Sequence, residues 1–143
     1  MDKLTREVYE HGKILESIVF FDKFLKTITS DDADNYTERL HQFSDEYIVQ
    51  HFDFEEQEIF PFIIQKGVSE EREFIEELQE DHRQILASLA GFKEIISLYD
   101  PQPPTKEQVK KIIKASEAVI SQILIHARKE DKKLFPTLKK YKV

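Results

Sequence analysis

The sequence predicts an all-α fold, an up-down-up-down antiparallel four-helix bundle, on three observations. Only three glycines and five prolines occur in 143 residues, which favours long helices over the frequent turns of an all-β protein. Apolar residues recur at spacings of three and four along four separate stretches, as they do on the buried face of an amphipathic helix. The breaks between these stretches are short, and short loops join antiparallel neighbours in a bundle.

The first two helices are expected over residues 3–28 and from the Thr29–Asp32 segment to about residue 60 or a little beyond. Residues 29–32 offer N-cap side chains for the second helix, and Pro61 and Gly67 weaken its end. The expected buried stripe of the first helix is Leu4, Val8, His11, Leu15, Ile18, Phe21, Leu25 and Ile28. That of the second is Phe43 or Ser44, Ile48, His51, Glu55 and Ile59.

The third helix is expected from an N-cap at Ser69, with Glu70 and Glu71 in its first turn, to just before Asp100. Three prolines at positions 101, 103 and 104 then make a short stiff connection. Thr105 and Gln108 form a capping box that begins the fourth helix. The expected stripes are Ile75, Leu78, His82, Ile85, Leu89, Phe92 and Ile96, and then Ile112, Val119, Ile123, His126, Glu130 and Leu134.

Composition limits the classes of function. The size and the 40% hydrophobic content fit one domain over residues 1–143. With no cysteine, thiolate zinc sites, cysteine-bound iron-sulfur clusters and thiol catalysis are excluded. The net charge of -7 argues against nucleic-acid binding. We also expect a cytoplasmic location and no membrane contact, because no signal peptide and no long apolar run is visible.

The chain contains an internal repeat of one helical hairpin. His11 aligns with His82 at an offset of 71 residues, and His51 aligns with His126 at an offset of 75. The second match extends to Glu55 with Glu130 and through the Phe-Pro pairs that follow. Four of the five histidines fall into these pairs, each on an apolar stripe where an unpaired imidazole is costly.

Six repeated side chains are expected to meet in one layer of the bundle. His51 with Glu55, and His126 with Glu130, are four residues apart and therefore share a helix face. At about 1.5 Å per residue, His11 and His51 both lie roughly 30 Å from the first turn. For each of the other two turns, the distances of the two flanking histidines from the turn agree within roughly 5 Å. The expected metal ligands are His11, His51, Glu55, His82, His126 and Glu130.

Four imidazoles and two carboxylates in one layer predict a binuclear metal site, with two histidines for each metal and the two glutamates as bridges. Nitrogen and oxygen donors without sulfur suit iron, and manganese or zinc tolerates the same donors. Two iron ions, which take five or six ligands, would leave a position at each metal for solvent, a bridging oxo or hydroxo group, or a small diatomic molecule.

Four further acids lie beside these residues and have two interpretations. Glu10 and Asp81 precede two of the histidines, and Glu56 and Asp131 follow the two glutamates. They either accept hydrogen bonds from imidazole N–H groups or are solvated charges on the helix surfaces. The fifth histidine, His41, aligns with Ser116 and is not expected to be a ligand.

Taken together, the segments EHGKIL, DHRQIL, HFDFEEQEIFP and HARKEDKKLFP resemble the hemerythrin-like HHE cation-binding domain over essentially the whole chain. The resemblance implies a non-haem di-iron centre in a four-helix bundle, with the four histidines as terminal ligands and Glu55 and Glu130 as bridges. Members of this family bind oxygen or nitric oxide, sense oxygen or iron, or take part in repairing iron centres.

One departure from the oxygen-carrying hemerythrins is visible. Those proteins place two histidines four apart on the third helix, whereas Leu86 stands four residues after His82 here. The resulting layout is nearly symmetric, with two open metals, and favours reaction with a ligand or its slow capture over reversible oxygen carriage.

Three functions follow as hypotheses. The first is a di-iron protein that binds or reacts with dioxygen, peroxide or nitric oxide in sensing or detoxification, with an electron-transfer partner if it turns over as an oxidoreductase. The second is an iron-handling or iron-centre repair protein with exchangeable metals. The third is a metal-free helical interaction module.

Overall fold

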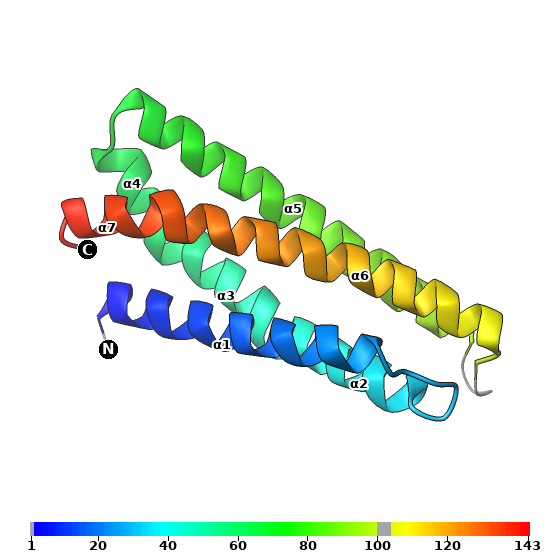
Figure 1. Ribbon diagram of the computed structural model, residues 1–143. Helices are drawn as coiled ribbons and strands as arrows, with labels where there is room; N and C mark the ends of the chain where they lie inside the picture. The colour runs from blue at the N-terminus through cyan, green and yellow to red at the C-terminus, as the bar shows by residue number, and fades with distance from the viewer. Residues whose placement is uncertain (1, 100–103) are drawn as a thin grey trace.

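The structure, a computed structural model, describes residues 2–99 and 104–143 and confirms the all-α four-helix bundle. Four antiparallel rods run along the molecule, and both termini lie at the same end (Figure 1). Three of the ten segments are π-helical turns, which close i→i+5 hydrogen bonds and are labelled η. In order, the segments are α1 (Lys3–Leu25), α2 (Ala33–Phe43), η1 (Ser44–Ile48), α3 (Val49–Phe54), η2 (Glu55–Ile59), α4 (Phe60–Lys66), α5 (Ser69–Ser97), α6 (Lys106–Lys129), η3 (Glu130–Leu134) and α7 (Phe135–Lys140).

Each rod packs against two neighbours. The first rod is α1, the second runs from α2 to α4, the third is α5, and the fourth runs from α6 to α7. Contacts join α1 to α2 and α6, and join α5 to α4 and α6. The second and fourth rods, which carry the two predicted glutamates, therefore face each other across the bundle.

Two predicted helix ends differ from the structure. The helix expected over residues 3–28 ends at Leu25, because the Lys26 and Thr27 N–H groups bond carbonyls three residues earlier and tighten the chain into a turn. The third helix takes Val68, not Ser69, as its N-cap. The Val68 N–H donates to the Glu71 carboxylate at 2.9 Å. An acid in the first turn therefore pairs with the backbone of the N-cap, and Ser69, the expected N-cap, is the first residue of the helix.

The fourth helix begins as predicted. The Gln108 N–H donates to Thr105 Oγ1 at 3.2 Å, and the Thr105 N–H donates to Gln108 Oε1 at 2.8 Å. This reciprocal pair confirms the capping box. In the connection before it, Pro104 is buried, whereas Pro101 and Pro103 lie outside the described residues.

Pro61 does not end the second rod, which runs on to Lys66. The π turn η2 comes directly before α4, in which Pro61 is the second residue. The Phe60 N–H bonds the Glu55 carbonyl five residues earlier, so the proline stands where the hydrogen-bond register changes. Pro136 stands in the same position after η3. The repeat noted in the sequence is therefore a repeat of this local backbone geometry.

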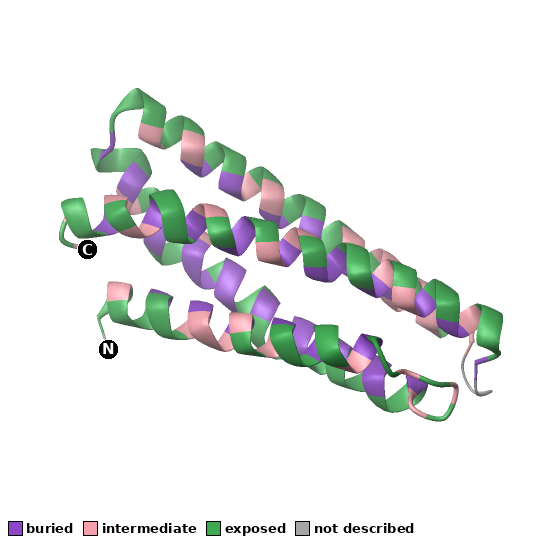
Figure 2. Cartoon of the chain, in the orientation of Figure 1, coloured by how far each residue is buried: buried purple, intermediate pink, exposed green. Residues whose placement is uncertain are grey.

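Two apolar clusters fill the bundle, one toward each end, and buried residues line the inward sides of the rods (Figure 2). The buried histidines and acids lie between the clusters. On the second rod, His51 and Glu55 stand between Ile48 of one cluster and Ile59 of the other. His82 stands in the same way between Leu78 and Ile85. The structure thus places these side chains in one layer, as the residue counts predicted.

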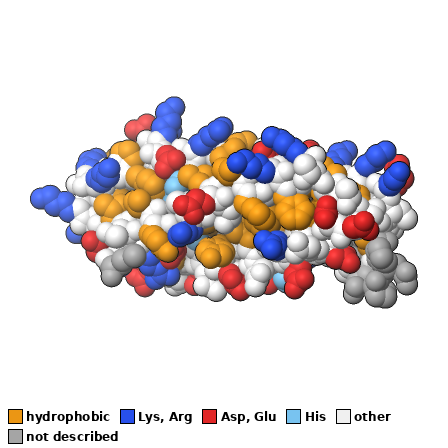
Figure 3. All heavy atoms as spheres, turned by 60° about the horizontal axis from the view of Figure 1, so that its bottom comes forward, with side chains coloured by type: hydrophobic (Ala, Val, Ile, Leu, Met, Phe, Trp, Pro, Cys, Tyr) orange, Lys and Arg blue, Asp and Glu red, His pale blue; other side chains and the backbone are white. Residues whose placement is uncertain are grey.

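The surface mixes side chains of all kinds. Figure 3 shows a face on which hydrophobic side chains lie between those of Lys, Arg, Asp and Glu. Several of the exposed hydrophobic side chains belong to α1, among them Val8, Val19 and Phe20. In the described part of the chain, none of the helices combines the length and the hydrophobicity that a bilayer crossing requires.

Candidate metal centre

All six residues expected as ligands are buried in the central layer. They come from all four rods: His11 from α1, His51 and Glu55 from the second rod, His82 from α5, and His126 and Glu130 from the fourth. None has more than 5% of its surface exposed. A seventh side chain, Glu7 of α1, joins them with 0% exposed.

The donor atoms of four of these residues lie within 4.8 Å of one another: Glu55, His82, His126 and Glu130. The Nε2 atoms of His82 and His126 are 3.1 Å apart, and His82 Nε2 is 3.0 Å from Glu55 Oε1. Two donors at right angles about an ion, each about 2.1 Å from it, are roughly 3.0 Å apart. The spacing of these nitrogens therefore suits ligands of one metal ion.

A second group with the same spacing contains Glu7, His51, Glu55 and Glu130. His51 Nε2 lies 3.5 Å from Glu55 Oε2 and 3.6 Å from Glu7 Oε1. His11 stands beside this group, because its Nδ1 atom is 3.8 Å from Glu130 Oε1. Only Glu55 and Glu130 belong to both groups, which is the position that bridging ligands would occupy.

Each histidine also meets one of the four neighbouring acids on its outer side. The distances from imidazole nitrogen to carboxylate oxygen are 3.0 Å for His51 with Glu10, 2.9 Å for His82 with Glu56, 3.0 Å for His126 with Asp81, and 3.0 Å for His11 with Asp131. Each acid lies on a rod next to that of its histidine. For Glu10, Glu56 and Asp81 the structure supports the interpretation that the acid holds an imidazole in place. Asp131 lies close to His11 Nε2 but is half exposed and makes no hydrogen bond with it.

These contacts fix which ring nitrogen faces the interior. In His51, His82 and His126, Nδ1 meets the outer acid and Nε2 points inward. In His11 the two nitrogens are exchanged, with Nε2 toward Asp131 and Nδ1 toward Glu130. In His11, therefore, Nδ1 is the nitrogen that faces the interior.

The layer holds polar atoms that the protein itself does not satisfy. Among the described residues, seven buried side-chain oxygens and nitrogens have no hydrogen-bond partner, and six of them belong to this cluster. The six are both carboxylate oxygens of Glu7, Nε2 of His11 and of His51, Oε2 of Glu55 and Oε2 of Glu130. Each such atom costs about 1–3 kcal/mol when left unpaired. His11 Nε2 faces Asp131, but the other five atoms belong to the two groups of clustered donors or point toward them, and cations that accept their lone pairs would remove the cost. The residues present therefore fit a metal site.

Electrostatics in the layer separate the two glutamates. Burial, together with the charges of Glu130 and Glu7, raises the pKa of Glu55 well above its usual value. Burial acts on Glu130 in the same direction, but hydrogen bonds with Glu55 and His11 hold its pKa below the usual value. Burial and the neighbouring His126 lower the pKa of His82 to about 3. His82 is therefore neutral and able to bind a metal across the physiological range.

The sequence did not identify Glu7 as a site residue, because its apolar neighbour Val8 was assigned to the buried stripe instead. Val8 was expected on the stripe, but it is 46% exposed, and Glu7 points inward instead. Counted from Glu7, the buried positions of α1 run through His11, Ile14 and Ile18 at spacings of four, three and four. Glu7 also stands four residues before His11, so it shares that histidine's face. This spacing was the signal that could have identified it.

The π turns position the two glutamates. Glu55 and Glu130 are each the first residue of a π turn, η2 and η3. Buried residues then follow at three successive spacings of four: His51, Glu55, Ile59 and Ile63, and likewise His126, Glu130, Leu134 and Leu138. In a regular α-helix each step of four overshoots one turn by about 40°. The wider π turn removes this drift and keeps each set on one face.

Aromatic rings cover the cluster. Phe52 stacks on His82 with a centroid distance of 3.8 Å and an angle of 9°, and Phe60 lies 5.3 Å from the same ring. On the other side, Phe135 meets His11 edge-on at 4.9 Å. These rings keep water from the histidine faces.

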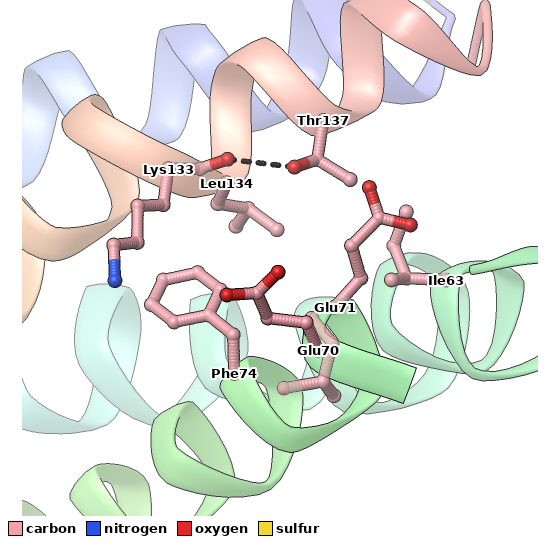
Figure 4. Close-up of a pocket in the computed structure, with 8 residues that line it drawn as sticks. Ile63, Glu70, Glu71, Phe74, Lys133, Leu134 and Thr137 are labelled. Atoms are coloured by element: carbon pink, nitrogen blue, oxygen red, sulfur yellow. Dashed lines mark hydrogen bonds between the residues drawn. The ribbon is translucent and has the colours of Figure 1, made fainter. Parts of the chain in front are cut away.

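Two surface pockets lie between α5 and the fourth rod. One, of about 240 Å³, lies between α5 and α6, and its lining reaches His126. The other, of about 220 Å³, lies at the end of the bundle between α5 and the fourth rod (Figure 4). Its Glu71 is already engaged by Val68, Lys140 and Tyr141, and its lining includes none of the cluster residues. Of these two pockets, the first is the one whose lining includes a residue of the cluster.

The fold and the buried cluster define a class of protein, a four-helix bundle with a carboxylate and imidazole site suited to metal ions. The family model described as the hemerythrin HHE cation binding domain matches residues 4–138. The chain belongs to this family, which confirms the resemblance seen in its sequence. Comparisons with curated proteins and with solved structures gave no match.

Proposed function

We propose that this chain holds two iron ions on His11, His51, Glu55, His82, His126 and Glu130, and that it binds or reacts with a small oxidant in sensing or detoxification. The observation that carries the proposal is the set of unsatisfied donor atoms in a layer otherwise closed by apolar side chains. A cluster kept only for packing would pair these atoms with one another or with backbone groups.

The residues around the ligands have defined tasks in this proposal. Glu10, Glu56 and Asp81 orient the imidazoles of His51, His82 and His126 and keep them basic. Phe52 and Phe60 limit water at His82. Iron bound here would supply electron transfer to and from dioxygen, peroxide or nitric oxide, which are small enough to enter through an apolar wall.

The pocket at His126 is the proposed route toward the layer. Gln122 and Lys129 line it together with His126. Gln122 Oε1 is buried and has no hydrogen-bond partner, so it can accept a hydrogen bond from a protonated molecule such as hydrogen peroxide. Lys129 binds Asp81 at 3.0 Å and Glu77 at 2.9 Å at the outer side of the same region, which leaves no free cation there to attract a charged substrate.

The test is metal analysis of protein purified under reducing conditions, followed by exposure to air, peroxide or nitric oxide. We expect two irons per chain and a change in visible absorption on exposure. Iron that is readily lost to a weak chelator would favour the iron-handling function. Protein that takes up no metal would leave the helical interaction module. Turnover with peroxide and an electron donor would separate an oxidoreductase from a binding protein.

A further inference from the structure

The two halves of the centre are not equivalent. Glu7 occupies the repeat position that Leu78 holds in the second hairpin, and both side chains are 0% exposed. A second difference lies at Phe52, which stacks on His82, because the repeat position in the other hairpin is Ala127. One half of the layer therefore has an additional carboxylate, and the other half has an additional aromatic ring.

The Glu7 carboxylate points into the layer without a partner. Oε1 lies 3.6 Å from His51 Nε2, and neither oxygen makes a hydrogen bond. The neighbouring cation does not reach it, because Arg6 bonds Glu10 at 2.7 Å and its guanidinium lies 3.9 Å from the Phe54 ring centre. A buried carboxylate whose oxygens make no hydrogen bond is unfavourable, and its position beside three other groups that could bind a metal, His51, Glu55 and Glu130, indicates what would compensate it.

We infer that Glu7 is a ligand of the metal held by His11 and His51, and that the small molecule binds at the other metal, held by His82 and His126. This inference rests on the function proposed above. With two imidazoles and an oxygen from each bridging glutamate, each metal has four protein donors. Glu7 brings the first metal to five, whereas Leu78 adds none to the second.

The position of the pocket between α5 and α6 agrees with this assignment. The pocket between α5 and α6 reaches His126, a ligand of the metal that lacks the additional carboxylate. Its lining does not include Glu7, His11 or His51. Under this inference the first metal would have one more protein ligand than the second, so the centre would be less symmetric than the layout expected from the sequence.

Glu7→Gln tests the inference, because glutamine keeps the size of the side chain but removes the negative charge and is a weak ligand. In the metal-free form we expect Glu7→Gln to melt at a higher temperature than the wild type, since a buried carboxylate whose oxygens make no hydrogen bond is gone. With iron we expect a smaller metal-induced rise in melting temperature and an affinity for one of the two irons at least ~10-fold weaker.

Nitric oxide bound per iron-loaded chain gives a second readout. The wild type should take one nitric oxide, and Glu7→Gln two, as measured by titration with absorption and electron paramagnetic resonance. Glu16→Gln is the matched control, because Glu16 lies on the same helix with 73% of its side chain exposed, and it should behave as the wild type. If Glu7→Gln does not fold, Glu7→Leu copies the residue of the second hairpin and takes its place.

The outcomes separate this inference from the proposed function. A wild-type chain that takes up no metal would overturn both. A wild type that holds two irons and binds two nitric oxides per chain would overturn the role of Glu7 alone. So would a Glu7→Gln variant whose melting temperatures, iron content and nitric oxide stoichiometry equal those of Glu16→Gln.

Discussion

The carboxylates of Glu55 and Glu130 lie buried on rods that face each other, and their environments differ from those of the acids around them. Glu55 is 0% exposed and Glu130 is 2% exposed, whereas Glu56 reaches the surface and bonds both His82 and Gln79. Adjacent residues of one helix thus have different tasks. Glu55 faces the metal-donor atoms of both halves of the layer, and Glu56 bonds His82 from the outer side.

This difference predicts the order of effects in alanine variants. Glu55→Ala and Glu130→Ala should each lose metal severely, since each removes a ligand shared by both positions. Glu56→Ala should weaken binding by only about 10- to 100-fold, the usual cost of removing a group that orients a ligand. Metal content after gel filtration measures this. Equal losses in all three variants would mean that the bridges are wrongly assigned.

The shifted pKa values also predict how metal binding depends on pH. Protons must leave before a metal binds. Burial and nearby charges raise the pKa of Glu55. Burial lowers that of His51, but Glu10 and Glu7 outweigh it and leave the pKa raised. Both groups therefore hold protons at higher pH than free side chains do, and acid competes with the metal.

We accordingly expect the apparent metal affinity to fall continuously from about pH 8 to about pH 5.5, with protons released on loading in weak buffer. His82 adds nothing to this dependence, because its pKa is about 3 and it is neutral throughout. A constant affinity over this range would contradict the predicted protonation of Glu55 and His51.

At the scale of elements, a buried hydrogen bond ties α2 to α6 in the half of the bundle away from the termini. The Tyr36 hydroxyl and the Ser116 hydroxyl bond each other, and both residues are 0% exposed. Burial raises the pKa of Tyr36 to about 12, so its hydroxyl stays neutral. The pair is separate from the metal layer, since Tyr36 belongs to the apolar cluster on that side.

Ser116→Ala should lower the free energy of unfolding by about 1–3 kcal/mol, because it leaves the Tyr36 hydroxyl buried without a partner. Tyr36→Phe should cost less, since the serine can turn to a backbone carbonyl of its own helix. The double variant should be less destabilised than the sum of the two. Urea unfolding measures all three, with unchanged metal content as the control. Strictly additive losses would mean that the bond contributes nothing.

The elements also show how far sequence reasoning reaches. The four rods, the Thr105 cap and the stripe of α6 follow from periodicity and capping chemistry alone. The π turns were not predicted, because one extra residue inside a helix leaves no break in the pattern. The sign of η2 and η3 in the sequence is that buried positions follow His51 and His126 at three successive spacings of four residues. The sequence did not indicate Val68 as the N-cap of α5, because its N–H is paired by an acid that lies inside the helix, Glu71.

In the site itself, the repeat identified the six expected side chains that the structure brings together, since histidine is rare and its matched positions stand out. Glu7 breaks the repeat, and comparison of one half with the other cannot reveal a residue that only one half has. Local spacing favoured Val8 for its apolarity. The spacing of four between Glu7 and His11 fits a shared face equally well, and the packed structure shows that Glu7 is the residue that faces the interior.

For the whole molecule, the polar layer divides the core into two apolar clusters, so stability should depend on what occupies it. Removal of metal with a chelator should lower the melting temperature by roughly 10 to 20 °C, if free metal before removal is about 1,000 times its dissociation constant. Calorimetry before and after verified metal removal measures this, and restored metal should reverse it. An unchanged transition would argue against a buried site that supports the fold.

The duplicated hairpin has one further consequence. If the bundle were assembled from two identical chains, a rotation axis between Glu55 and Glu130 would impose every substitution on both sides at once. Joining the hairpins in one polypeptide lifts that constraint. Either half can then change alone, so specialisation of a single side becomes possible without loss of the shared framework.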